Sequence, residues 1–111
     1  MENHFNVARV NELFRDLIPF FMQNRQTELV DLEKWLAAKD FSSIARLGHK
    51  LYGSGATYGF LLLAQLARQL ESAGQRLDGE SVQKIIGDIR NHIENVKVEF
   101  ISHSSADPSL Y

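Results

Sequence analysis

Apolar residues recur at intervals of three and four along most of the chain, which is the spacing of a buried helical face. The longest run predicts a helix near residues 18–39, provided that Arg25 lies in the apolar stripe and its charge reaches solvent. Pro19 fits the first turn of this helix, because the missing N–H of proline costs little there. A shorter helix is predicted before it. Its apolar positions are Val7, Val10, Phe14 and Leu17.

Three further helices are predicted after residue 40. Asp40 suits the N-cap of the first, because a carboxylate accepts hydrogen bonds from the free N–H groups of a first turn. Gly59 separates the first from the second, and Asp78-Gly79 ends the second before a last helix from about 80 to 102. The core positions of the three helices are, in order, Phe41, Ile44, Leu47, Leu51, Gly55 and Tyr58; Leu63, Leu66, Ala67, Leu70, Ala73, Gly74 and Leu77; and Val82, Ile85, Ile89, Ile93, Val96 and Phe100.

This pattern contains no strand-like alternation, so the expected fold class is all-α. Four amphipathic helices joined by turns of two to four residues favour an antiparallel up-down four-helix bundle with a short extra N-terminal helix. No linker or internal repeat divides the 111 residues. We therefore expect one domain over residues 1–111, with an ordered core at about 5–102 and a polar tail at 103–111.

Composition narrows the possible chemistry. A net charge of −2 argues against binding to nucleic acid or to an anionic membrane. The absence of cysteine excludes disulfides, thiolate nucleophiles and cysteine-based metal centres. No secretory signal or spanning apolar run is visible, so we expect a cytoplasmic protein without membrane insertion. The four histidines lack paired metal-ligand spacing, and no metal site is expected.

The helix that follows residue 40 carries an unusual surface around His49. At about 100° per residue, His49 lies about 200° from Leu51 and should face solvent. The positions that share its side are small: Ala45, Gly53 and Ala56. A glycine inside a helix costs about 0.5–1 kcal/mol relative to alanine, which close approach of another surface to the imidazole would offset. Alternatively, Gly48 and Gly55 serve helix packing alone and the histidine is an ordinary surface residue.

A family resemblance begins at this histidine. Residues 49–71 read HKLYGSGATYGFLLLAQLARQLE, which resembles HxLKGxxxxxGxxxLxxLxxxLE, the signature of histidine-containing phosphotransfer (HPt) domains. The positions in register are His49, Leu51, Gly53, Gly59, Leu63, Leu66, Leu70 and Glu71. The helix before this segment is also similar to that of the family. One position departs from the signature: the family usually has lysine three residues after the histidine, where this chain has Tyr52.

The resemblance implies that His49 accepts a phosphoryl group from the aspartate of one receiver domain and passes it to another. The implied partners are response-regulator receiver domains and a hybrid histidine kinase, and the implied carrier is a cytoplasmic monomer. The Gly-rich stretch at 53–59 lacks the GK[ST] ending of a nucleotide-binding loop, so we do not expect an enzyme in its own right. No cofactor of its own is expected, because the receiver would bring Mg²⁺.

The resemblance also suggests which residues surround the histidine. If the helices on either side of residues 58–59 form an antiparallel hairpin, Glu71 and Arg68 become neighbours of His49. Glu71 could then accept a hydrogen bond from one imidazole nitrogen and leave the other free. The alternative is that Glu71 is only a solvated helix residue.

Other residues are candidates for contact with phosphate or with a docked partner. A cation that compensates for the missing lysine could come from Arg46, Lys50 or Arg68. The apolar candidates for docking are Tyr52 and Leu61, beside the bare position of Gly53. Alternatively, Arg46 and Lys50 are a pair of solvated surface cations. Tyr58 and Phe60 are interpreted as core plugs at the helix turn.

A second function stays open from the sequence. Because Tyr52 replaces the usual lysine, the bundle could be a non-transferring helical docking module that binds a receiver or kinase domain. A histidine on a cleared face favours the carrier, since a docking module does not need that residue. Whether the chain is free-standing or part of a larger kinase is also open. Met1 and the short polar tail favour a free-standing protein.

Overall fold

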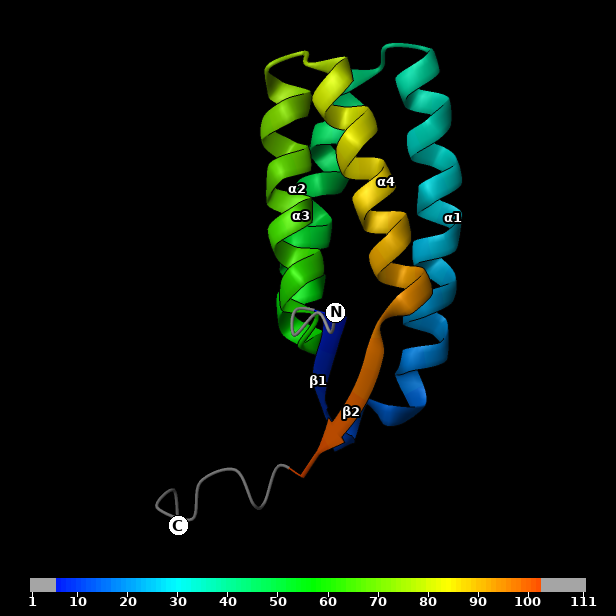
Figure 1. Cartoon of the computed structure of the whole chain (residues 1–111), viewed down its shortest axis with the longest axis vertical. Helices are drawn as coiled ribbons and strands as arrows, with labels where there is room; N and C mark the ends of the chain where they lie inside the picture. The colour runs from blue at the N-terminus through cyan, green and yellow to red at the C-terminus, as the bar shows by residue number, and fades with distance from the viewer. Residues whose placement is uncertain (1–5, 103–111) are drawn as a thin grey trace.

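The computed structural model describes residues 6–102, so the predicted polar tail at 103–111 lies outside the described residues. The four long helices are α1 (Ile18–Ala37), α2 (Phe41–Tyr58), α3 (Leu61–Gln75) and α4 (Gly79–Asn95). They run alternately up and down, with short turns between them (Figure 1). The prediction of an all-α, antiparallel up-down bundle is therefore confirmed, with an added pair of short strands at one end.

The segment before α1 is not the short helix that the apolar spacing predicts. It forms the strand β1 (Val7–Asn11) and then the 3₁₀ helix η2 (Glu12–Leu17). Ala8 and Val10 are buried while Arg9 between them is exposed, which is the alternation of a half-buried strand. Five residues are too few for the helical and strand periods to be distinguished by apolar spacing alone, which is why the prediction is wrong here.

The last helix is also shorter than predicted, because α4 ends at Asn95 and Val96 is already extended. The strand β2 (Lys97–Ile101) follows and pairs in parallel with β1, from Val7 opposite Lys97 to Asn11 opposite Ile101. The Asn95 side chain donates a hydrogen bond of 2.8 Å to the backbone carbonyl of Asn91, which gives an acceptor of the last turn a second partner. The two strands lie together at the lower end of the bundle (Figure 1).

The core lies between the four helices and under the strand pair. Phe60 is fully buried and stacks on Phe21 with ring centroids 4.6 Å apart, while the half-buried Tyr58 contacts Phe21 and Phe14 at 4.9 Å each. The interpretation of Tyr58 and Phe60 as core plugs is confirmed. The largest fully buried side chains are Phe60, Leu32, Ile44, Leu51, Leu63, Leu70, Ile86, Ile89, Val10 and Val82.

Arg25 differs from its predicted environment, because its charge does not reach solvent. The residue is 5% exposed, and its guanidinium lies 4.3 Å from the centroid of the Phe21 ring. Two of its nitrogens donate to the two carboxylate oxygens of Glu28, one turn further along α1. This pairing explains the burial, since a charge inside a bundle needs both a counter-ion and hydrogen bonds.

The α1–α2 and α3–α4 turns share one construction. Each helix is followed by a residue with a left-handed φ of 57°, Lys39 and Leu77 respectively. Asp40 and Asp78 then cap the next helices, each accepting hydrogen bonds from the backbone N–H and the hydroxyl of the serine three residues later. These bonds lower the pKa of both aspartates. The predicted cap at Asp40 is confirmed, but Leu77, predicted as a core position, is 69% exposed.

Candidate functional site

His49 lies near the middle of α2, and its side chain is 78% exposed. The surface beside it is bare, as predicted: a Cβ added at Gly53 would meet nothing within 4 Å, and Ala56 is exposed. Ala45 is half-buried instead, because it packs against Gly74 of α3. An imidazole in such a position is open to a large partner as well as to small molecules.

The other glycines of α2 have a packing role. A Cβ at Gly48 would lie 2.7 Å from the backbone nitrogen of Glu71, and one at Gly55 would lie 3.2 Å from that of Ala64. These two glycines therefore let α2 and α3 approach closely, as the alternative interpretation of the glycines proposed. The glycines of α2 therefore differ in their surroundings: Gly48 and Gly55 serve packing, and Gly53 leaves open space beside the histidine.

The close approach of the two helices brings Glu71 to the imidazole. The Nδ1 atom of His49 lies 3.1 Å from Oε2 of Glu71, so the predicted neighbourhood is confirmed. An ionised carboxylate only accepts hydrogen bonds, so Nδ1 is the nitrogen that carries the proton in this contact. The lone pair of neutral His49 is then on Nε2, the nitrogen that Glu71 does not hold.

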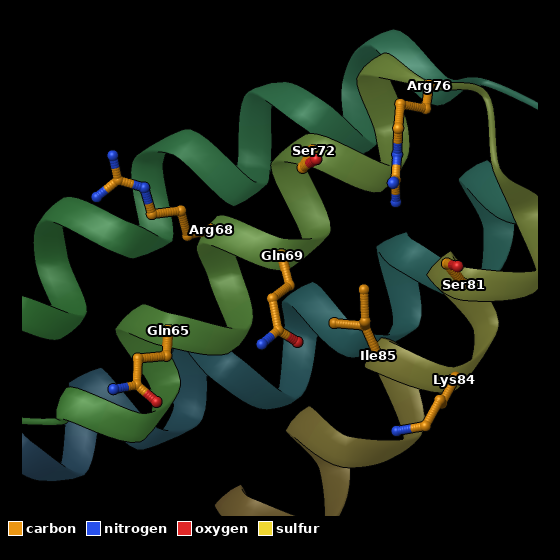
Figure 2. A pocket seen from close by; sticks show the side chains of 8 residues that line it. All are labelled: Gln65, Arg68, Gln69, Ser72, Arg76, Ser81, Lys84 and Ile85. Carbon is orange, nitrogen blue, oxygen red and sulfur yellow. The ribbon is translucent and has the colours of Figure 1, made fainter.

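A second pair lies one turn further along the same two helices. The guanidinium of Arg68 is 4.8 Å from the centroid of the Tyr52 ring, and Tyr52 is 39% exposed. Figure 2 shows that the Arg68 side chain extends from α3 toward α2. The structure thus brings four predicted site residues together on the α2–α3 side: His49, Glu71, Tyr52 and Arg68.

Arg46 and Lys50 lie on the other side of α2. Together with Trp35, Ser43 and Leu47 they line a groove of about 210 Å³ between α1 and α2. Lys50 also lines a second, longer groove of about 590 Å³ between the same helices. The three cations predicted as substitutes for a lysine are therefore divided, with Arg68 on the α3 side and the other two on the α1 side.

Leu61 is 66% exposed, but the structure does not bring it to the histidine. It begins α3 at the turn, ten residues before Glu71, and so lies about 15 Å along the helix axis from the His49–Glu71 contact. Phe20 was not among the predicted site residues, yet it is 67% exposed on α1 and lines the longer groove beside Lys50 and Tyr58. Its position off the apolar stripe of α1 was the available signal for an exposed aromatic residue.

A groove of about 660 Å³ lies between α3 and α4 (Figure 2). Two of the cations that line it already have carboxylate partners. The Nη2 atom of Arg76 lies 3.8 Å from Oδ2 of Asp78, and Nζ of Lys84 lies 2.8 Å from Oδ2 of Asp88. His49 does not line this groove, so its volume does not identify the functional site.

The other described histidine, His92, is buried within the fold and not exposed as His49 is. It is 2% exposed, its Nδ1 lies 2.9 Å from Oδ1 of Asn6, and burial lowers its pKa. His4 and His103 lie outside the described residues. Within residues 6–102, no three His, Cys, Asp or Glu side chains cluster as metal ligands would. Over the same range, no helix has the length and hydropathy needed to cross a membrane.

Comparison with curated proteins finds one relative at significant similarity. The chain is 26% identical over 94 residues to "Multistep phosphorelay regulator 1" of Schizosaccharomyces pombe. The aligned region covers 85% of this chain and 30% of that relative, so the chain spans under a third of the relative's length. No solved structure matches the chain at the same significance.

A family model gives the assignment. The model of the Hpt domain matches residues 16–99, a range that contains α1 to α4 and every site residue described above. Domains of this family are phosphocarrier modules rather than catalysts, and their role is phosphotransfer within phosphorelays. The exposed histidine of α2 and the helical bundle agree with that assignment. On this match, the chain belongs to the Hpt domain family.

Proposed function

We propose that this domain carries a phosphoryl group on Nε2 of His49, accepting it from the aspartate of one receiver domain and passing it to that of another. The observation that carries the proposal is the geometry of the imidazole. Its side chain is 78% exposed, and its Nδ1 is hydrogen-bonded to Glu71, so the nucleophilic nitrogen is the one left free. The name of the S. pombe relative, a phosphorelay regulator, supports the same role.

In the proposed transfer step, one bond forms at His49 and one bond breaks at the receiver's aspartate. The Nε2 lone pair attacks the phosphorus of the receiver's aspartyl phosphate, a P–N bond forms, and the P–O bond to the aspartate breaks. The aspartate leaves as a carboxylate, and the Nδ1 proton stays between His49 and Glu71. The phosphorylated ring then carries a positive charge, which the Glu71 carboxylate stabilises. Reversal of the same step donates the group to the next receiver.

The bundle itself contributes positioning, and the receiver contributes the remaining groups. Phosphoryl transfer needs in-line geometry and charge neutralisation more than covalent chemistry, and the receiver's own Mg²⁺ and lysine supply much of the latter. The bare surface at Gly53 lets the receiver approach, and exposed Tyr52 and Phe20 offer apolar contacts. We also propose that the domain works as a cytoplasmic monomer, without a cofactor of its own.

The test is direct labelling. Purified domain is mixed with receiver domains phosphorylated by acetyl phosphate and Mg²⁺, and acid-labile, base-stable label on the domain is measured. We expect label on wild type and on His4→Gln and His103→Gln, which remove other histidines, but none on His49→Gln. Label that persists in His49→Gln contradicts the proposal. Binding without label across a broad receiver panel indicates the non-transferring docking module instead.

A further inference from the structure

We propose that Arg68, held against the ring of Tyr52, is the cation that binds the phosphoryl group once His49 is phosphorylated. The inference rests on the proposed carrier function and deepens it. The guanidinium lies 4.8 Å from the Tyr52 ring centroid, and a cation over an aromatic face is attracted by the ring quadrupole. Tyr52 therefore restricts the otherwise mobile arginine side chain and keeps one ordered positive charge near the histidine.

The placement follows from the antiparallel hairpin of α2 and α3. Tyr52 comes three residues after His49 on α2, and Arg68 comes three residues before Glu71 on α3. The Tyr52–Arg68 pair therefore lies one turn, about 5 Å, from the His49–Glu71 pair along the hairpin. In Figure 2 the Arg68 side chain leaves α3 toward α2, away from the other labelled side chains of the α3–α4 groove.

The other two cations near the histidine are less suitable. Arg46 and Lys50 line the groove between α1 and α2 with Trp35 and Leu47, on the side of α2 turned away from Glu71. Arg68 lies on the same side as Glu71, and an aromatic contact fixes its position. An ordered cation loses less side-chain entropy on binding an anion than a solvated one does.

The geometry of a guanidinium allows both contacts at once. A guanidinium that stacks on an aromatic ring uses the face of its planar group, whereas hydrogen bonds to phosphate oxygens use the N–H groups along its edge. Arg68 can therefore donate paired hydrogen bonds to the phosphoryl oxygens without leaving the ring. Tyr52 acts as a positioning residue, and its replacement of the usual family lysine is compensated from the neighbouring helix.

The experiment loads the phosphoryl group without a receiver. Phosphoramidate phosphorylates imidazoles directly, and the ³¹P NMR signal of His49 is assigned as the one missing in His49→Gln. The protonation of its phosphoryl oxygens is then followed as a function of pH. A nearby guanidinium favours the dianion, so we expect Arg68→Gln to move the titration midpoint to higher pH. In a phosphotransfer equilibrium with a receiver, the same change should lower the equilibrium constant about tenfold, as expected for one charge-assisted hydrogen bond.

Matched variants separate a specific contact from general effects. Arg90→Gln removes the same charge from α4, where Arg90 lies 3.9 Å from Glu33, and should leave the midpoint unchanged. The midpoint of Tyr52→Phe, which keeps the aromatic face, should lie close to that of wild type, whereas Tyr52→Leu should shift the midpoint partway toward that of Arg68→Gln. Tyr52→Lys in the Arg68→Gln background should restore it. Urea unfolding of each variant checks that the fold is retained.

Two results would overturn the inference: coincident titrations of wild type and Arg68→Gln, or a shift produced by Arg46→Gln in place of Arg68→Gln. Failure of the proposed function has a different signature. If no receiver labels His49 but the chemically loaded domain shows the Arg68-dependent shift, the carrier role fails while the phosphate contact stands.

Discussion

Gly48 lies so close to Glu71 that a Cβ at the glycine would be 2.7 Å from the backbone nitrogen of the glutamate and 3.0 Å from its Cα. The contact therefore determines how near α3 comes to the helix that carries His49. Because the obstructing atoms belong to the backbone, they can make room only if the two helices separate. The residue next to the histidine thus controls the distance between the imidazole and the carboxylate that holds it.

Gly48→Ala should consequently destabilise the domain. Alanine favours a helix interior by up to about 1 kcal/mol relative to glycine, but overpacking costs about 1–3 kcal/mol, so we expect a net loss of about 1–2 kcal/mol. Urea unfolding measures it. The wider helix separation should also weaken the contact between Nδ1 of His49 and Glu71, which the ¹⁵N shifts of the imidazole report as a mixture of tautomers.

Gly87→Ala provides the control for that substitution. Gly87 is exposed within α4, and a Cβ there would meet nothing within 4 Å. Only the helix propensity then acts, and we expect a gain of about 0.5–1 kcal/mol. If Gly48→Ala and Gly87→Ala change the free energy of unfolding alike, the packing role of Gly48 is wrong.

Glu71→Gln tests what the charge of the carboxylate contributes. The amide oxygen still accepts a hydrogen bond from Nδ1–H, so the tautomer of His49 should persist, in contrast to Glu71→Ala. The positive charge of the phosphorylated ring, however, loses its counter-ion. Since a protonated ring is the better leaving group, we expect phosphoryl transfer to a receiver to slow about two- to fivefold, the scale of a partly exposed ion pair. Equal single-turnover rates for wild type and both variants would show that Glu71 has no part in transfer.

Leu77→Gly should stabilise the α3–α4 turn. Leu77 is 69% exposed with a φ of 57°, a left-handed conformation that costs a non-glycine residue about 1–2 kcal/mol. Glycine removes this cost but increases the entropy of the unfolded chain, which leaves a net gain of about 0.5–1 kcal/mol. Thermal unfolding measures the gain. Leu77→Ala keeps the unfavourable φ and should show none, so a similar rise in both variants would point to another cause.

Sequence spacing was sufficient where a helix was long and had one buried face. The stripes of α2 and α3 gave the exposure of His49, and a count from the turn at residues 58–59 gave the neighbourhood of Glu71. Both steps need only the helical period and a short antiparallel connection. Arg68 could be listed as one of three candidate cations, but its contact with the Tyr52 ring could not be predicted, because side-chain rotamers decide it.

Apolar spacing could not predict the two strands. β1 and β2 are five residues each and lie about ninety positions apart, so neither carries a local signal of its partner. Val96 and Phe100 also continue the spacing of α4, which made the strand look like helix. The buried ion pair between Arg25 and Glu28 was not predicted either, because the sequence is equally compatible with Glu28 at the surface.

The free energy of unfolding should decrease as the pH is lowered through a range set by His92. The residue is 2% exposed in α4, its Nδ1 contacts Oδ1 of Asn6, and its Nε2 is buried without a hydrogen-bond partner within residues 6–102. Burial lowers the pKa of His92 from its ordinary value of 6.5, so the unfolded chain binds a proton more readily than the folded one. The stabilisation is therefore complete above about pH 6.5 and is lost as the pH falls from there toward the lowered pKa.

Urea unfolding between pH 7.5 and 5 checks this dependence, in a range above the titration of most carboxylates. We expect the free energy of unfolding to fall by up to about 1.4 kcal/mol per pH unit, the limit for one proton. His92→Leu removes the titrating group and should give a curve that is flat by comparison, even if its stability is lower at every pH. Should His92→Leu keep the full slope, the proton responsible is bound elsewhere, and the burial of His92 is not its cause.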